Sequence, residues 1–299
     1  MEETVFSELD LMPKIQMAID EMGFDAATEI QAKAIPIIRS GADVIGRSQT
    51  GTGKTLAFAI PAIEKIDTDE DRTTVQILIL CPTRELAMQA CEEIKKLIKY
   101  KSGIYPVEEY GGAPIERQIM KLRKANIVIG TPGRVMDHMR RRTLKLDNLK
   151  MVVLDEADEM LSMGFKEDIE TILMDTPEDR QTILFSATMP APIMALTKQF
   201  QKNPKLIEIN KAKVTLENIN QSFVDVPMGR KMDALNLMLR FYAPKLAIIF
   251  CNTKSMVDDV SGYLTNNGFN AEGLHGDMKQ SQRTKVMDSF KYGKTAILV

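Results

Sequence analysis

The sequence predicts an α/β protein built from two parallel-sheet domains, of which the second is incomplete. After residue 40, short apolar runs rich in β-branched residues alternate with loops and amphipathic helical patterns. Continuous apolar strands that alternate with helices are typical of βαβ units, whose parallel sheets are buried on both faces. The chain has 299 residues, which favours two domains at roughly 150 residues per domain. Its content of 44% hydrophobic and 27% charged residues is that of ordinary globular domains.

The first unit contains a series of predicted strands separated by helices. The strand candidates are residues 44–45, 75–81, 126–130, 151–154 and 181–186, with 205–209 closing the unit. Between them, residues 85–99 place Leu86, Ala90 and Ile94 on one helical face. Because ligands of parallel sheets bind at the carboxyl ends of the strands, we expect functional residues in the loops that follow them.

The second unit repeats the pattern over a shorter length. We predict an N-terminal domain at 1–209, a polar linker at 210–220 and a partial C-terminal domain at 221–299. Its strand candidates are residues 221–226, 246–251, 269–274 and 295–299. Because the last run ends at the final residue, we expect a truncated domain.

Composition and charge exclude several classes of protein. The longest mostly apolar stretch, residues 56–63, is far shorter than a membrane span, and the N-terminus lacks a signal-peptide pattern. Three cysteines in no metal or disulfide spacing indicate a reduced, cytoplasmic protein. With a net charge of -2, a polyanion would have to bind in a local groove. The densest basic run is residues 140–142, for which a solvated helix end is at least as good an interpretation as a phosphate contact. His138 is expected on a solvated helix face.

A glycine-rich segment after the first strand indicates a phosphate-binding loop. It comprises Ser48, Gln49, Thr50, Gly51, Thr52, Gly53, Lys54 and Thr55, and it opens a helical pattern. Its glycines let backbone N–H groups approach phosphates, and the helix N-terminus adds positive potential. We expect Lys54 to contact the β- and γ-phosphates of the ligand and Thr55 to bind Mg²⁺. Ser48 stands where the general pattern has glycine, and the alternative is an ordinary glycine turn.

An acidic cluster, residues 155–158, follows the apolar strand at 151–154. Carboxylates at the end of a buried strand are costly unless a metal ion or another partner compensates their charge. Asp155 is therefore a candidate Mg²⁺ ligand, and Glu156 a candidate base that orients and deprotonates the attacking water. The alternative for the cluster alone is a helix N-terminal cap.

Asp-Glu-Ala-Asp together with this phosphate loop resembles the DEAD-box ATP-dependent RNA helicases, and the resemblance covers essentially the whole chain. It implies two RecA-like domains, ATP and Mg²⁺ as cofactors, and RNA as the partner. Residues 23–24 and 28–31 resemble the family's Q motif, with Ala27 where proline is usual. The resemblance assigns Phe6 to adenine stacking and places Phe24 and Gln31 in the nucleotide site. An amide can read both a donor and an acceptor of adenine.

Four segments resemble the RNA-binding elements of that family. They contain Pro82, Thr83 and Arg84; Gly111 and Gly112; Thr131, Pro132, Gly133 and Arg134; and Arg283. Hydroxyls, glycine amides and arginines suit contact with a sugar-phosphate backbone that ignores base sequence. The alternative for each segment alone is a strand-to-helix turn with an N-cap.

Ser186 and Thr188 match the family's coupling motif, which implies contacts with Asp155 and Asp158. The family's arginine-rich motif lies beyond Val299, so we expect this chain alone to hydrolyse ATP poorly. The expected function is ATP-driven local unwinding of RNA duplexes or remodelling of RNA–protein complexes. The alternatives are an ATP-gated RNA clamp or scaffold, and a P-loop ATPase that acts on DNA.

Overall fold

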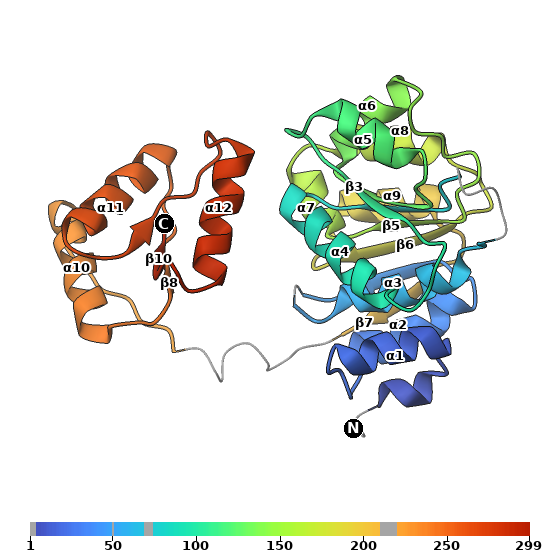
Figure 1. Ribbon diagram of the computed structural model, residues 1–299, viewed down its shortest axis with the longest axis horizontal. Coiled ribbons are helices and arrows are strands. Elements are labelled where there is room, and N and C mark those ends of the chain that lie inside the picture. Colours follow the sequence, from blue (N-terminus) through green and yellow to red (C-terminus); the bar gives the residue numbers. More distant parts are fainter. Residues whose placement is uncertain (1–3, 50, 69–73, 210–219) are drawn as a thin grey trace. The chain divides into compact units, whose positions relative to one another are not determined.

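The computed structural model describes residues 4–49, 51–68, 74–209 and 220–299 of the chain (Figure 1). It divides into two compact units, residues 1–212 and 213–299. The predicted linker at 210–220 lies almost wholly outside the described residues, so the predicted domain bounds stay a prediction. In the described parts of the chain, no helix is both long enough and apolar enough to cross a membrane.

The first unit is built on a seven-stranded sheet with the order β3-β4-β2-β5-β6-β1-β7. Its strands are β1 (Val44–Arg47), β2 (Ile77–Leu80), β3 (Pro106–Glu109), β4 (Ile127–Gly130), β5 (Met151–Leu154), β6 (Gln181–Ser186) and β7 (Lys205–Glu208). All neighbouring strands are parallel, which confirms the predicted α/β class. Six of the strands overlap the predicted runs, whereas β3, an edge strand with polar residues, is additional.

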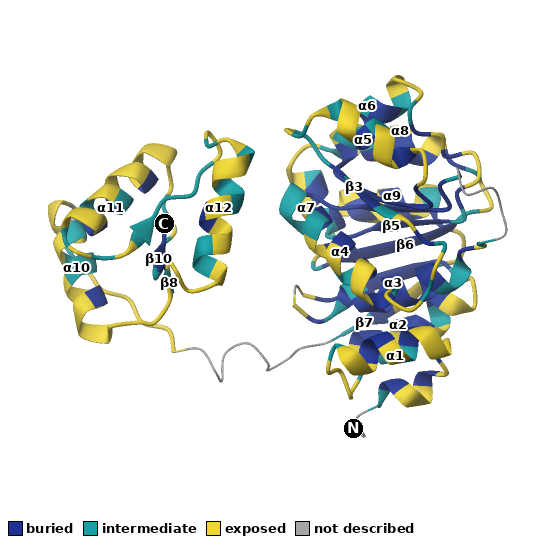
Figure 2. Cartoon of the chain, viewed as in Figure 1, coloured by how far each residue is buried: buried dark blue, intermediate teal, exposed yellow. Residues whose placement is uncertain are grey.

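Helices cover both faces of this sheet. They are the 3₁₀ turn η1 (Phe6–Leu9) and the α-helices α1 (Pro13–Glu21), α2 (Glu29–Arg39), α3 (Lys54–Lys65), α4 (Arg84–Leu97), α5 (Ile115–Leu122), α6 (Pro132–Arg140), α7 (Ala157–Ser162), α8 (Lys166–Met174) and α9 (Ala191–Phe200). One core joins η1 and α1 to α4 with one face of the sheet, and the other core joins α5 to α9 with the opposite face. Along β5, Met151 and Val153 belong to the first core, and Val152 and Leu154 to the second. This period of two is the signature of a strand buried on both sides, as the dark strands of Figure 2 show.

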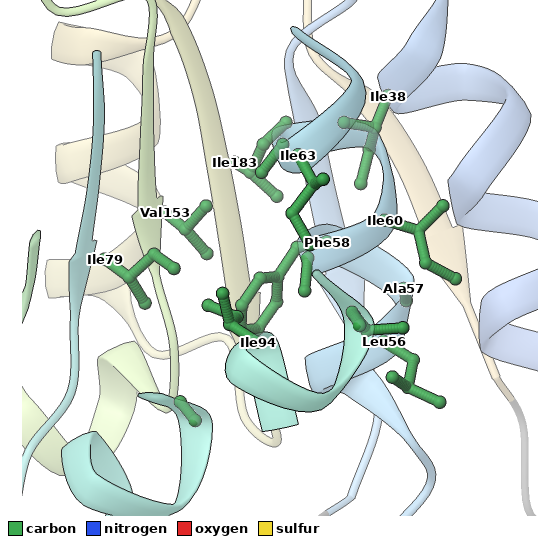
Figure 3. Close-up of a cluster of buried hydrophobic side chains, with 14 of the residues drawn as sticks. Ile38, Leu56, Ala57, Phe58, Ile60, Ile63, Ile79, Ile94, Val153 and Ile183 are labelled. Carbon is green, nitrogen blue, oxygen red and sulfur yellow. The ribbon is translucent and has the colours of Figure 1, made fainter. Parts of the chain in front are cut away.

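The helix after the phosphate loop is held by apolar contacts on several sides. In Figure 3 the Phe58 ring, on α3, points toward Ile79 and Val153 of the sheet, with Ile94 of α4 beside it. A Cβ at Gly46 on β1 would lie 2.2 Å from the Phe185 ring, so only glycine fits there. This packing fixes α3, and with it the position of the loop at its N-terminus.

The second unit contains a smaller parallel sheet with the order β8-β10-β9. Its elements are η2 (Met228–Arg230), α10 (Lys231–Tyr242), β8 (Ala247–Ile248), α11 (Lys254–Asn266), β9 (Ala271–Glu272), α12 (Gln280–Lys291) and β10 (Ile297–Leu298). Three of the predicted strands are present in shortened form. The strand predicted at 221–226 is wrong: these residues have no regular structure, and Phe223 is 94% exposed. An apolar run becomes a strand only where a neighbouring strand accepts its hydrogen bonds.

Candidate functional site

The strand order divides the carboxyl edge of the seven-stranded sheet into two halves. The loops after β5, β6 and β1 carry the acidic cluster, Ser186 and the phosphate loop, and we call them the phosphate-loop half. The loop after β3 carries Gly111–Gly112, and the helices that follow β4 and β2 carry Arg134 and Arg84 in their first turns; we call these segments the arginine half. Because β2 pairs with β5, the two halves meet at the centre of the sheet.

The phosphate loop follows β1 and ends where α3 begins at Lys54. Gly51 and Gly53 have φ angles of 75° and 87°, a left-handed conformation that glycine adopts without strain. The Thr52 hydroxyl donates to the Gln49 carbonyl oxygen at 3.0 Å, which closes the turn. Ser48 is buried and Thr55 is half-buried, whereas Thr50 lies outside the described residues.

Three charged groups gather beside this loop. Lys54 and Asp155 are 6% and 8% exposed, and Lys54 Nζ lies 4.0 Å from Glu156 Oε1. Within the described residues, neither Lys54 Nζ nor Asp155 Oδ1 has a hydrogen-bond partner. Burial raises the pKa of Asp155 to about 6, while Lys54 opposes and Glu156 adds to the rise. Buried charges without hydrogen bonds are costly, so this arrangement favours a charged ligand that satisfies them.

A cavity of about 390 Å³ lies between these groups, lined in part by Gly53, Lys54, Thr55 and Asp155. No cluster of three or more His, Cys, Asp or Glu side chains able to hold a metal ion occurs in the described residues. Mg²⁺ is usually held by one or two carboxylates together with substrate phosphates, not by an all-protein cage. Thr55 and Asp155 therefore fit a magnesium ion that arrives with a phosphate ligand.

The backbone at Glu156 is also unusual. Glu156 has a φ of 54° and caps α7 in the left-handed conformation, which costs energy for a residue with a Cβ. Such strained positions are concentrated at functional sites. The conformation directs the chain sharply from β5 into α7, with the Glu156 carboxylate beside the phosphate loop.

The predicted Q-motif glutamine is bonded to the phosphate loop itself. Gln31 is 3% exposed, its Nε2 donates to the Gly53 carbonyl oxygen at 3.1 Å, and its Oε1 accepts from Thr28 N at 2.8 Å. A contact with adenine would require Gln31 to exchange one of these bonds. Phe6 is 1% exposed within the first core, and Phe24 is 43% exposed, so of the two predicted aromatics Phe24 has the accessible ring.

A chain of hydrogen bonds joins the phosphate loop to the acidic cluster. Ser48 N donates to the Ser186 carbonyl oxygen at 3.1 Å, and the Ser186 hydroxyl donates to the Thr188 carbonyl oxygen at 2.6 Å. Thr188 N and Oγ1 donate to Asp158 Oδ2 at 3.0 and 2.7 Å. Burial opposes ionisation of Asp158, but hydrogen bonds from Thr188 and Ser186 outweigh it and lower its pKa. The three predicted coupling residues are thus brought together.

In the arginine half, Arg84 and the two glycines lie against each other. A Cβ at Gly112 would lie 2.4 Å from Arg84 Nη1, and Gly112 has a φ of 85°. Thr83 Oγ1 accepts from Leu86 N at 3.3 Å and so caps α4, and Pro82 before it is buried. The loops after β2 and β3 are therefore in direct contact.

The third loop of this half is tied down by a buried polar network. Arg134 Nη1 donates to the Ala113 carbonyl oxygen at 3.2 Å and to Gln118 Oε1 at 2.5 Å. His138 Nε2 lies 3.2 Å from Gln118 Oε1 and 3.0 Å from Glu109 Oε2, and both His138 and Glu109 are fully buried. The expectation of a solvated His138 is wrong, because α6 turns this residue toward β3 and α5. Burial raises the pKa of Glu109, which His138 opposes.

Thr131, Pro132 and Gly133 lead from β4 into α6, with Thr131 as the residue before the helix. Gly133 is exposed and Thr131 is 9% exposed. Arg283, in the second unit, is a half-buried residue of α12.

Sequence reasoning missed two groups of residues at these sites. Gln89 and Glu93, on α4, line the cavity beside the phosphate loop. Gln118, His138 and Glu109 form the network under Arg134. The spacing of Gln89 and Glu93 was an available signal, since residues four apart on a helix share one face.

Comparisons with known proteins bear on these sites. The family model described as DEAD/DEAH box helicase matches residues 28–196, and the model described as helicase conserved C-terminal domain matches residues 230–299. The chain is 50% identical over 297 residues to the ATP-dependent RNA helicase CshA of Listeria monocytogenes and 45% identical over 296 residues to that of Bacillus subtilis. These matches cover 99% and 98% of this chain but 56% and 59% of the relatives, so the chain spans little more than half their length.

Solved structures of the same family are also similar. A DEAD box protein from the hyperthermophile Methanococcus jannaschii matches all of this chain and 80% of its own, with a TM-score of 0.66 and 42% identity. Saccharomyces cerevisiae Dbp5 bound to RNA and ADP BeF3 matches 99% of this chain and 75% of its own, with a TM-score of 0.88 and 30% identity. From the family models and from relatives at this identity, the chain belongs to the DEAD-box helicase family, with RecA-like folding of its parallel sheets.

Proposed function

We propose that this protein is an ATP-dependent RNA helicase that couples ATP hydrolysis to local separation of RNA duplexes. The observation that carries the proposal is a pair of buried, opposite charges beside a cavity of about 390 Å³. These groups, Lys54 Nζ and Asp155 Oδ1, have no hydrogen-bond partner among the residues that the structure describes. A triphosphate with its magnesium ion supplies a partner for both groups at once. The names of the curated relatives support the same activity.

In this proposal each residue of the phosphate-loop half has a defined role. The backbone of residues 48–53 and the Lys54 ammonium would hold the phosphates, and Thr55 and Asp155 would hold Mg²⁺, whose positive charge would stabilise negative charge on the phosphates. Glu156 orients a water molecule and accepts its proton. Catalysis then rests on positioning and electrostatics, without a covalent intermediate.

We propose that the arginine half binds the sugar-phosphate backbone of RNA, without regard to base sequence. Arg84, the Gly111–Gly112 turn and the start of α6 present a guanidinium, backbone amides and a hydroxyl along one edge of the sheet. Dbp5, a similar protein, is recorded bound to RNA. Arg283 would add a contact from the second unit.

The hydrogen-bond chain through Ser48, Ser186, Thr188 and Asp158 is the proposed coupling between the two halves. Movement of the phosphate loop on nucleotide binding would reach the acidic cluster through β6. The acidic cluster follows β5, which pairs directly with β2 of the arginine half.

We further propose that these 299 residues by themselves hydrolyse ATP slowly, because the arginine-rich motif of the family's second domain does not occur in them. An ATP-gated RNA clamp is the other function compatible with the same residues. A cytoplasmic location is part of the proposal and is supported by three cysteines in no disulfide or metal spacing.

Single-turnover hydrolysis of ATP, with the protein in excess and RNA present, tests the role of Glu156. We expect Glu156→Gln to slow hydrolysis about 100-fold or more while the Kd for ATP stays within about two-fold. Glu159→Gln, an exposed carboxylate of the same helix, is the matched control and leaves both quantities unchanged. Near-normal hydrolysis by Glu156→Gln would remove it as the base.

Strand displacement on matched RNA and DNA duplexes separates the helicase from the other functions. Displacement of RNA alone supports the proposal, because a 2′-hydroxyl contact distinguishes the two nucleic acids. Retention of labelled RNA without displacement supports the clamp. Equal displacement of blunt DNA contradicts the RNA assignment.

A further inference from the structure

A second, larger cavity lies at the opposite edge of the seven-stranded sheet. Its volume is about 740 Å³, and it is lined by residues that precede β2, β4 and β5, among them Val75, Leu122 and Leu144. Because the phosphate loop and the arginine half follow the carboxyl ends of strands, this cavity at the amino ends is separate from both. Its size lies within the range of pockets that hold small molecules.

The cavity is strongly basic in a chain whose net charge is -2. Its lining includes Arg123, Arg142 and Lys145 and one carboxylate, Asp147. Within the described part of the chain, no carboxylate is paired with any of these three cations, whereas the neighbouring Arg141 pairs with Asp137 at 2.9 Å. Three cations around one concavity, none of them paired with a described carboxylate, favour a ligand with at least one phosphate group.

The backbone at Arg142 supplies independent support. Arg142 N donates to the Met139 carbonyl oxygen at 2.9 Å, and Thr143 N to that of His138 at 3.0 Å, which together form a Schellman motif at the end of α6. Arg142 occupies the left-handed position of this motif with a φ of 56°, where glycine is the preferred residue. Glu156, at the proposed catalytic site, is another described residue with a long charged side chain and a positive φ. An arginine kept at a position that favours glycine indicates a role for its side chain.

The remaining lining is suited to the rest of a nucleotide. Val75, Leu122 and Leu144 are at most 5% exposed and form an apolar surface, against which a nucleobase can pack. Thr143, Asn148 and Asp147 supply hydroxyl, amide and carboxylate groups for the edges of a base or for ribose hydroxyls. A purely acidic peptide would not cover the apolar surface, and Asp147 would repel it.

We propose that this cavity is a second nucleotide-binding site, in which Arg142, Arg123 and Lys145 hold a phosphate and the apolar surface packs against the nucleobase. The nucleotide is either free in solution or part of an RNA strand that extends beyond the proposed RNA interface. The site is independent of the proposed function, because it uses neither Lys54 nor the arginine half.

Binding of ADP and of a ten-nucleotide single-stranded oligouridine, each measured at two salt concentrations, tests the site. All variants carry Lys54→Ala, so that the phosphate loop does not contribute. We expect the further change Arg142→Gly to weaken at least one probe about ten-fold or more. Since glycine relieves the strained φ, the same change keeps or raises Tm, by about 1–3 °C, and lost folding cannot explain the lost binding.

Arg141→Ala is the matched control, because it removes the same charge from the same helix end outside the cavity. We expect it to change the Kd of either probe less than about two-fold. A loss confined to ADP assigns the site to free nucleotides, and a loss confined to the oligouridine assigns it to RNA.

Three outcomes overturn the proposal: no binding of either probe to the Lys54→Ala chain, equal losses for Arg141→Ala and Arg142→Gly, or displacement of the probe by polyglutamate at equal concentration. The last would identify an acidic peptide as the occupant. A failure of the proposed ATP site is detected separately, because the Lys54→Ala variant would then bind ATP with the same Kd as the unchanged chain.

Discussion

The two halves of the carboxyl edge differ in the hydrogen bonds that their charged residues make. In the phosphate-loop half, Lys54 Nζ and Asp155 Oδ1 are buried and have no hydrogen-bond partner among the described residues. In the arginine half, Arg134 is hydrogen-bonded to Gln118 and Ala113, and Thr83 caps α4. We propose that a ligand neutralises and completes the first half, whereas the second half is held in shape by its own contacts.

This difference follows from the chemistry each half is proposed to perform. A triphosphate and a metal ion bring charge into a small cavity, so buried protein groups that lack hydrogen bonds there would gain partners on binding. RNA offers a long series of similar phosphates, so the protein gains from a rigid edge on which loops keep their spacing. The predictions below test each half separately.

The largest expected effect is on Lys54. Lys54→Ala removes the cation that faces Asp155 and Glu156, and we expect ATP affinity to fall about 100-fold or more. Titration with a fluorescent ATP analogue measures the loss. Lys33→Ala, which removes an exposed lysine paired with Glu29 on α2, is the control and changes nothing. An unchanged Kd for Lys54→Ala would place the phosphates elsewhere.

The second effect is on stability and its pH dependence. The pKa of Asp155 is raised to about 6 in the folded chain from an ordinary 3.8, so the folded state holds this proton more tightly than the unfolded state. Its contribution to the free energy of unfolding therefore falls as pH rises from about 4 to 6, and stays low above that range. For the ligand-free chain, Asp155→Asn should raise the free energy of unfolding by up to about 3 kcal/mol at pH 7, and by about 1 kcal/mol less at pH 5.

Urea unfolding followed by circular dichroism at both pH values checks this prediction. Asp179→Asn, an exposed carboxylate in a turn before β6, serves as the control and has no effect at either pH. A destabilised Asp155→Asn chain at pH 7 would show that the buried carboxylate is compensated within the fold.

The third effect concerns the network under Arg134. Gln118→Met keeps the volume of the side chain but leaves Arg134 and His138 without a shared acceptor. We expect RNA affinity to fall about ten-fold, with ATP affinity measured without RNA unchanged. Fluorescence anisotropy with labelled RNA is the measurement, and Gln16→Met on the exposed face of α1 is the control. Equal losses for ATP and RNA would indicate a general loss of folding.

The smallest effect comes from a pair of glycines with similar backbones. Gly112 and Gly164 have φ angles of 85° and 88°, but only at Gly112 would a Cβ meet Arg84, at 2.4 Å. Gly112→Ala and Gly164→Ala therefore carry similar backbone strain, while the first also displaces Arg84. We expect RNA affinity to fall about three-fold more for Gly112→Ala, a difference of about 0.7 kcal/mol. Equal affinities would show that Arg84 does not contribute to binding.

Much of the fold could be predicted from the sequence, because period-two burial and apolar runs report strands that are covered on both faces. The runs at 151–154 and 181–186 became β5 and β6 with the predicted bounds. The edge strand β3 was not predicted as a strand, since its Glu108 and Glu109 break the apolar pattern. Residues 221–226 have the apolar pattern of a strand, but they pair with no strand in the described part of the chain.

The site was predictable where one short segment carries the chemistry, as in residues 48–55. It was not predictable where residues from separate elements meet. His138 and Gln118 read as polar residues on amphipathic helices, and nothing in their spacing shows that α5 and α6 turn them inward toward Glu109. Likewise, the contact between Arg84 and Gly112 depends on the sheet order β3-β4-β2, which the chain order does not reveal.

The place of β1 in the sheet has a consequence for synthesis on the ribosome. The strand that carries the phosphate loop lies between β6 and β7, so Val44 pairs with Ile183 and Lys205. Asp43 binds Thr182 N across a separation of 139 residues. A nascent chain that has emerged only through α4 contains the whole phosphate loop yet lacks both strands that hold it. We therefore expect the emerging polypeptide to become able to bind nucleotide late and abruptly, once the segment around residue 205 leaves the exit tunnel.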